Sequence, residues 1–268
     1  MSNFWQRLFT GTVFVSVLMA AIIYGPLSSQ ILFLWIALLS LSEFYKLFKN
    51  TTYQPNTILG LAAGCLIYIV ITGIAGDIVN PKYIYLLLPV CCLLFFAELY
   101  RKKEPPFMNI ALTLAGIIYA VIPLALLNFI CVIDHQYHYK ILLGYFFVLW
   151  THDIMAYIFG RWIGKHRLFE RISPKKSWEG SIGGMLSAMG MAFALAQFFT
   201  ELTTVDWIII TGIIVITGTL GDLVESMLKR SLNVKDSGTI LPGHGGLLDR
   251  FDALFLSVPF VLVYLMLR

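Results

Sequence analysis

Charged residues are scarce in this 268-residue chain, and Asp, Glu, Lys and Arg together occupy only 13% of its positions. Soluble globular proteins carry about a quarter charged residues, whereas 59% of this chain is hydrophobic. A chain of this composition cannot cover a water-facing surface, which excludes a soluble globular domain and requires lipid as solvent. At about 20 apolar residues per helix, the chain has room for up to about nine or ten membrane-spanning helices.

Cysteine is also rare, with four residues, and every one of them lies in an apolar run: Cys65, Cys91, Cys92 and Cys131. No C-x-x-C pair occurs, and no histidine stands at ligand spacing from any cysteine. This usage excludes a disulfide framework and a structural zinc site, and it is typical of small buried side chains.

Nine apolar runs predict an all-α, polytopic transmembrane protein. The expected spans are roughly 8–24, 28–42, 57–75, 83–97, 107–130, 140–160, 180–199, 205–228 and 251–267. The first run could also be read as a cleaved signal peptide. We favour an uncleaved span, because the run leads through Gly25 and Pro26 directly into the next one.

The basic residues predict the orientation of these spans. With the N-terminus on side one and nine crossings, side one receives 16 basic residues and side two receives three, Lys82, Lys140 and Arg268. Because cytoplasmic loops are enriched in Lys and Arg, side one is expected to be cytoplasmic. The N-terminus is then inside and the C-terminus outside.

Two of the side-one loops are long and rich in Gly, Lys, Arg, Asp and His, at 161–179 and 229–250. They divide the chain into an N-terminal region of about five membrane spans (1–139) and a C-terminal region that carries the chemistry (140–268). Between the loops, the seventh span repeats a small residue at every fourth position: Gly180, Gly184, Ala188, Ala192 and Ala196. Such a stripe indicates close packing against another helix backbone.

The end of the eighth span places charged residues on one helical face, because Asp222, Glu225, Ser226 and Lys229 follow at i, i+3, i+4 and i+7. Acidic side chains are costly at membrane depth, so the pair of acids indicates a functional site. The alternative for Glu225 is a water-exposed helix end at which it pairs with Lys229.

The second long loop contains Lys235 and Asp236, then the run Pro242-Gly243-His244-Gly245-Gly246, and leads to Asp249, Arg250 and Asp252. Glycines allow backbone N–H groups to approach phosphate. Carboxylates suit Mg²⁺, which commonly bridges protein acids and substrate phosphates. Acids for a metal among bases for phosphates are what phosphoryl or nucleotidyl transfer requires.

The first long loop contains Ser173, Lys175 and Lys176 just before a predicted helix start, a position that favours anions. An ordinary positive-inside loop would contain the same basic residues. Asp153 lies inside the sixth span, where an ionisable group indicates function.

These residues resemble the signature of the CDP-diacylglycerol synthase family, the phosphatidate cytidylyltransferases. The run from Ser226 to Asp252 carries it, with residues at the matching places: Ser226, Lys229, Arg230, Lys235, Asp236, Gly238, Pro242, His244, Gly245, Gly246, Asp249, Arg250 and Asp252. The stretch from Asp153 to Gly180 is also similar. It departs where the family commonly has D-[TS]-G-A-Y, because this chain has Ile154 and Met155 after the aspartate.

The resemblance implies that CTP and phosphatidate react to CDP-diacylglycerol and pyrophosphate in phospholipid biosynthesis. It implies Mg²⁺, in some members with a second cation, and often a homodimer in a bacterial cytoplasmic membrane; no nucleic acid is expected as a partner. Asp222 and Asp249 match the metal-binding aspartates, and with Lys229 and His244 they form the expected catalytic set. The expected substrate-binding set is Asp153, Ser173, Lys175, Lys176, Ser226, Arg230, Lys235, Asp236, Gly245, Gly246, Arg250 and Asp252.

Two other functions would explain part of this pattern. A CTP-dependent polyprenol or phytol kinase would use an alcohol as the acceptor, and the full match from Ser226 to Asp252 disfavours it. A secondary transporter of an anionic substrate would also place acids in the membrane. The absence of an inverted repeat in the sequence, and the long loops on one side only, disfavour a transporter.

Overall fold

The computed structural model describes residues 3–133, 136–240, 243 and 245–268. Within these residues, nine helical segments are long and apolar enough to cross a membrane. This confirms the predicted all-α, nine-span architecture. The helices are α1 (Asn3–Tyr24), α2 (Pro26–Lys46), α3 (Thr57–Ala75), α4 (Leu87–Arg101), α5 (Pro106–Gly116), α6 (Ile122–Ile130), α7 (Tyr139–Ile163), α8 (Trp178–Phe198), α9 (Thr204–Ser231) and α10 (Leu248–Leu267).

Short elements complete the chain. The 3₁₀ turn η1 (Pro81–Leu86) precedes α4, and the π-helical turn η2 (Ile117–Val121) joins α5 and α6 into one span. Two antiparallel hairpins lie outside the spans, β1 (Val132–Ile133) with β2 (Gln136–Tyr137), and β3 (Arg167–Phe169) with β4 (Ser173–Ser177). The loop predicted at 161–179 is therefore shorter than expected and contains a hairpin.

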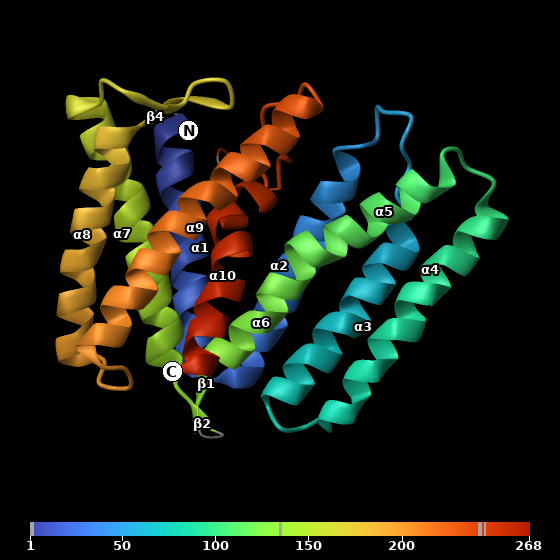
Figure 1. Cartoon of the computed structure of the whole chain (residues 1–268), viewed down its shortest axis with the longest axis horizontal. Coiled ribbons are helices and arrows are strands. Elements are labelled where there is room, and N and C mark those ends of the chain that lie inside the picture. The colour runs from blue at the N-terminus through green and yellow to red at the C-terminus, as the bar shows by residue number, and fades with distance from the viewer. Residues whose placement is uncertain (1–2, 134–135, 241–242, 244) are drawn as a thin grey trace.

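The connections between spans alternate between two ends of the molecule (Figure 1). The N-terminal end of α1, the β3–β4 hairpin and the α2–α3, α4–α5 and α9–α10 connections lie at one end, which we call the hairpin end. The C-terminus and the β1–β2 hairpin lie at the other. The connections with most of the basic residues are thus together, as the alternating topology predicts. Which end faces the cytoplasm stays a prediction.

Helix α8 packs closely on α7 along its small residues. A Cβ at Gly180 would lie 2.7 Å from the Ala156 carbonyl oxygen, and one at Gly184 would lie 2.8 Å from that of His152. Gly180, Gly184, Ala188 and Ala192 are all buried. The structure therefore confirms the stripe as a packing surface, and it places the β3–β4 hairpin and α7 beside one another.

The N-terminal spans support the C-terminal ones through a continuous buried core. Aromatic pairs join the region before residue 139 to the region after it. The ring centroids are 6.2 Å apart for Phe33 and Phe146 and 5.1 Å apart for Tyr119 and Phe255. The two predicted regions, 1–139 and 140–268, therefore share one core and do not pack separately. That the chemistry lies in the second region stays a prediction.

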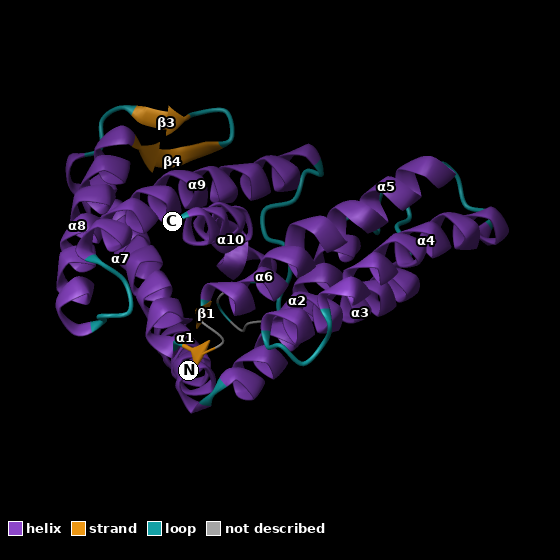
Figure 2. Cartoon of the chain, turned by 60° about the horizontal axis from the view of Figure 1, so that its bottom comes forward, coloured by secondary structure: helices purple, strands orange, loops and turns teal. Residues whose placement is uncertain are grey.

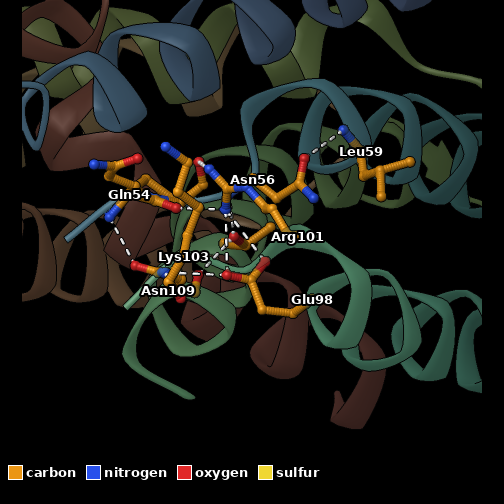
Figure 3. Close-up of polar contacts among 9 residues, drawn as sticks. Gln54, Asn56, Leu59, Glu98, Arg101, Lys103 and Asn109 are labelled. Atoms are coloured by element: carbon orange, nitrogen blue, oxygen red, sulfur yellow. Dashed lines mark hydrogen bonds and ion pairs between the residues drawn. The ribbon is translucent and has the colours of Figure 1, made fainter. Parts of the chain in front are cut away.

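Helices α3, α4 and α5 project away from α7 and α8 (Figure 2). At the hairpin end of this arm, a polar network that we call the Glu98 cluster joins Gln54, Glu98, Arg101 and Asn109 (Figure 3). Asn109 donates a hydrogen bond of 3.0 Å to Glu98 and accepts one of 2.7 Å from the Gln54 N–H. Arg101 forms a 3.2 Å ion pair with Glu98. The cluster ties the α2–α3 connection to α4 and α5.

Candidate active site

A cavity of about 680 Å³ opens among α7, α8, α9, α10 and the β3–β4 hairpin. Both signs of charge line it. Its acidic residues are Asp153, Asp222, Asp236, Asp249 and Asp252, and its basic residues are Arg161, Arg167, Lys175, Lys176, Lys229 and Arg250. The remaining walls are His152, Ala156, Tyr157, Gly160, Ser177, Ser181, Gly218 and Thr219. Segments from across the C-terminal half of the chain therefore meet in one polar chamber.

Asp222 stands on α9 at the point where α9 approaches α10. A Cβ at the preceding residue, Gly221, would lie 2.6 Å from the Asp252 carbonyl oxygen, so only glycine allows this approach. One Asp222 carboxylate oxygen is 2.7 Å from the Lys176 ammonium of β4, and the other accepts a 3.3 Å hydrogen bond from the Ser226 hydroxyl. The hairpin is thus joined electrostatically to α9.

Asp249, in the first turn of α10, has partners on both carboxylate oxygens. Oδ1 lies 2.6 Å from the Lys229 Nζ. Oδ2 accepts hydrogen bonds of 3.0 Å from the backbone N–H groups of Ser237 and Gly246. Charge-assisted bonds of this kind are the stronger class of hydrogen bond. The α9–α10 connection is therefore folded around the Asp249 carboxylate.

Glu225 is fully buried, with a side-chain exposure of 0%, and it forms a 3.2 Å ion pair with Lys229. The predicted helical face is confirmed by this pair, but the alternative of a water-exposed helix end is wrong for Glu225. A buried carboxylate is costly unless it is paired. Lys229 lies between Glu225 and Asp249 and offsets the charge of both.

Eleven of the residues predicted to act here line the cavity or bond directly to a residue that does. Asp153, Lys175, Lys176, Asp222, Lys229, Asp236, Asp249, Arg250 and Asp252 line it, and Ser226 contacts Asp222. Among the described residues, the lining does not include Ser173, Arg230, Lys235 or the glycines Gly245 and Gly246, although Gly246 donates to Asp249. His244 lies outside the residues that the structure describes.

The departure from the family pattern after Asp153 lies outside the described lining of the cavity. Ile154 is 58% exposed, and neither Ile154 nor Met155 is among the described residues that line the cavity. Asp153 itself faces the cavity. The residues at these two positions therefore contribute no side chain to the described wall of the cavity.

Sequence reasoning missed several residues of this region. Arg167, Ser181 and Thr219 line the cavity without any local pattern that sets them apart. Glu43, near the end of α2, is 1% exposed and accepts a 2.8 Å hydrogen bond from the Leu248 N–H. An acidic residue at the end of an apolar run was the available signal for Glu43, but nothing local connects it with α10.

The donor set suits Mg²⁺. No group of three or more acidic, His or Cys side chains forms a closed metal cluster among the described residues. Mg²⁺, however, is commonly held by one or two carboxylates together with substrate phosphates. Asp222 and Asp249 open onto one cavity, and each now pairs with an ammonium group as its counter-cation. Two hard oxygen donors beside a basic wall fit a cation that arrives with polyphosphate.

The sequence is similar to known proteins along nearly its whole length. The model of the cytidylyltransferase family matches residues 5–268. A phosphatidate cytidylyltransferase of Staphylococcus saprophyticus is 35% identical over 266 residues, 97% of this chain and 98% of the relative. The enzymes of the same name from Staphylococcus haemolyticus and Staphylococcus aureus are 34% and 32% identical, each over 94% of this chain and 97% of the relative.

Proposed function

This chain belongs to the cytidylyltransferase family, and we propose on that premise that it transfers the cytidylyl group of CTP to phosphatidate. The products are CDP-diacylglycerol and pyrophosphate. One observation supports this most directly: a single cavity joins five aspartates and six basic residues at one end of a bundle of membrane-spanning helices. A nucleotide from water and a phosphate headgroup at the membrane surface can both reach such a site.

The reaction exchanges one phosphorus–oxygen bond for another. A phosphate oxygen of phosphatidate attacks the α-phosphorus of CTP, and the bond from that phosphorus to the oxygen bridging the α- and β-phosphates breaks. The electron pair leaves with pyrophosphate. The attacking phosphate is already ionised near neutral pH, so no strong general base is required. Holding both phosphates in line supplies much of the acceleration, because orientation replaces a bimolecular encounter.

The basic residues bring two polyanions together. Lys175 and Lys176 extend from β4, while Lys229 and Arg250 extend from α9 and α10, so they approach the cavity from different elements. We assign Lys229 to the leaving pyrophosphate, because its ammonium lies between the carboxylates of Glu225 and Asp249. We assign Lys175 to ground-state binding of phosphate. Neither assignment requires a large motion of the backbone.

Asp222 and Asp249 are proposed to hold Mg²⁺ when CTP binds, through the carboxylate oxygens that now contact Lys176 and Lys229. Bound there, the cation would neutralise triphosphate charge and stabilise the leaving group. The two ammonium groups are then free to turn towards phosphate oxygens. The family resemblance also implies a second cation, which stays part of this proposal. The homodimer is proposed on the same ground, and size-exclusion chromatography in detergent would test it.

The orientation in the membrane is proposed from the 16-to-3 partition of basic residues, and the three relatives named above are bacterial. The protein would then lie in a bacterial cytoplasmic (inner) membrane, with the hairpin end facing the cytoplasm. Lys235 is exposed in the α9–α10 connection and suits a labelling test. In a variant without native cysteines, Lys235→Cys should react with a membrane-impermeant thiol reagent only after cells are opened. Reaction in intact cells would reverse the orientation.

The activity is tested with purified protein in detergent, Mg²⁺, labelled CTP and phosphatidate. We expect a lipid-soluble nucleotide and one pyrophosphate for each turnover. Soluble CDP with a phosphorylated alcohol would indicate the kinase instead, and the absence of any pyrophosphate would favour transport. Omitting phosphatidate is the matched control, since the proposed transfer then has no acceptor.

A further inference from the structure

We infer that Glu43 is a positioning residue that holds Asp249 in its working orientation, although it stands in the N-terminal half of the chain. This inference rests on the proposed function, because it takes Asp249 as part of the reacting site. Glu43 and Leu248 are 205 residues apart in sequence. Glu43 is 1% exposed, and it is not among the described residues that line the cavity. Its influence on the reaction therefore passes through other residues.

The first contact is with the start of α10. That helix has no side-chain cap of its own, since its N-cap residue is Leu247. Glu43 Oε2 accepts the Leu248 N–H at 2.8 Å instead. A helix leaves its first N–H groups without partners and carries partial positive charge there, so a carboxylate stabilises it. Glu43 thus supplies, from α2, the cap that α10 lacks.

The second contact is with the loop that precedes α10. The Ser237 hydroxyl donates to Glu43 Oε2 at 3.5 Å. Gly238 and Gly246 lie directly against the same carboxylate, where an added Cβ would come within 2.3 Å and 2.6 Å of a Glu43 oxygen. There is no space for a side chain at either glycine. The two loop segments are therefore shaped to the surface of Glu43.

Asp249 binds the same loop segments from the other side. Its Oδ2 accepts the N–H groups of Ser237 and Gly246. Ser237 thus contacts Glu43 through its hydroxyl and Asp249 through its backbone, and Gly246 lies between the two carboxylates. If Glu43 loses its bonds, the loop that fixes Asp249 Oδ2 is freed. Oδ1 can then move relative to Lys229, from which it is 2.6 Å distant.

Two substitutions separate hydrogen bonding from mere filling of space. Glu43→Ala removes the acceptor for the Leu248 N–H. Glu43→Gln retains one acceptor oxygen, and the other oxygen, Oε1, has no hydrogen-bond partner among the described residues, so an amide nitrogen can replace it there. The matched control is Glu98→Ala, since Glu98 is also buried, at 4% exposure, but belongs to the Glu98 cluster of the α2–α3 connection, α4 and α5.

We expect Glu43→Ala to lower kcat by roughly 10- to 100-fold, as displacement of a reacting group by about an ångström does. The KM for CTP should stay within about threefold, because the basic wall is unchanged. Glu43→Gln should recover most of kcat. Glu98→Ala should keep the kcat of the folded fraction. Hydrogen–deuterium exchange should rise in residues 237–248 for Glu43→Ala and not for Glu98→Ala.

Three outcomes would overturn the inference: wild-type kcat in Glu43→Ala, an equal loss in Glu43→Gln, or losses in Glu43→Ala and Glu98→Ala that follow the folded fraction alone. Failure of the proposed function is distinguishable. In that case wild-type protein forms no CDP-diacylglycerol from CTP and phosphatidate, while the exchange difference between Glu43→Ala and Glu98→Ala still reports whether Glu43 holds the loop.

Discussion

Two regions at the hairpin end pair acidic side chains with cations, and the partners differ in kind. In the Glu98 cluster, Glu98 is held by the amide of Asn109 and by Arg101, which also donates to the Gln54 carbonyl at 2.5 Å. In the cavity, Asp222 and Asp249 are each paired with a lysine ammonium. The first region is closed by a planar amide and a guanidinium, and the second faces a cavity through flexible cationic side chains.

This difference separates an acid that fastens the structure from the acids that are proposed to take part in the reaction. Planar amide and guanidinium groups hold a carboxylate in one geometry, so the Glu98 cluster fastens segments together. Lysine is a compact charge on a long stem, and it can exchange a carboxylate for a phosphate with little backbone motion. Burial of an acid alone is therefore weak evidence for catalysis. Its partners, and the space beside it, decide the role.

The largest effect should come from removing either carboxylate of the cavity. Asp222→Asn and Asp249→Asn should each lower kcat by about 10³-fold or more, because each removes a proposed Mg²⁺ ligand. Turnover of purified protein at several Mg²⁺ concentrations is the measurement. Near-normal activity of either variant at ordinary Mg²⁺ would end the assignment of that aspartate as a ligand, and with it the contrast to Glu98.

A smaller effect is expected at Lys229. Lys229→Gln leaves Glu225 and Asp249 without the ammonium that lies between them, and it removes a charge assigned to the leaving pyrophosphate. We expect kcat to fall by roughly 10- to 100-fold with a modest change in the KM for CTP. Lys140→Gln is the matched control, because Lys140 also pairs with an acid, Glu201 at 3.1 Å, but is not among the described residues that line the cavity. A drop as large in Lys140→Gln would argue against a specific role of Lys229.

Lys175→Gln should act mainly on binding. Lys175 is exposed on β4 at the cavity wall, so it can contact phosphate equally in the ground and transition states. Uniform binding of that kind appears in KM and leaves kcat unchanged. We expect the KM for CTP or phosphatidate to rise about threefold to tenfold. Steady-state kinetics with both substrates varied is the measurement. If every kinetic constant matches the wild type, Lys175 is only an ordinary basic residue of a cytoplasmic loop.

The smallest effect on chemistry is expected in the Glu98 cluster, where the effect should be on stability. Glu98→Gln loses the ion pair with Arg101 but keeps an acceptor for Asn109. Loss of a hydrogen bond to a charged group costs about 1.5–3 kcal/mol, so the unfolding temperature in detergent should fall while kcat at low temperature stays near the wild-type value. A selective loss of kcat without thermal destabilisation would make the two regions alike after all.

Composition and local sequence pattern were sufficient to predict the membrane spans, one helical face and one packing surface of this protein. Nine spans follow from apolar length, because helices are the means by which a chain satisfies its backbone in lipid. The shared face of Asp222 and Lys229 follows from helical periodicity, and the stripe from Gly180 to Ala192 predicted its own packing role. The family resemblance in the C-terminal half identified most of the charged residues that the structure brings to one cavity.

The tertiary structure alone decided which charges meet. Sequence spacing does not place Lys176 of β4 on Asp222 of α9, and it does not bring Glu43 of α2 to the start of α10. The alternative of an exposed helix end for Glu225 was excluded only by the tertiary structure, in which Glu225 is fully buried. The physical reason is range: periodicity orders residues within one helix, whereas ion pairing and burial depend on which helices become neighbours. In this chain that is decided by close packing at Gly180, Gly184 and Gly221, where helix backbones approach one another.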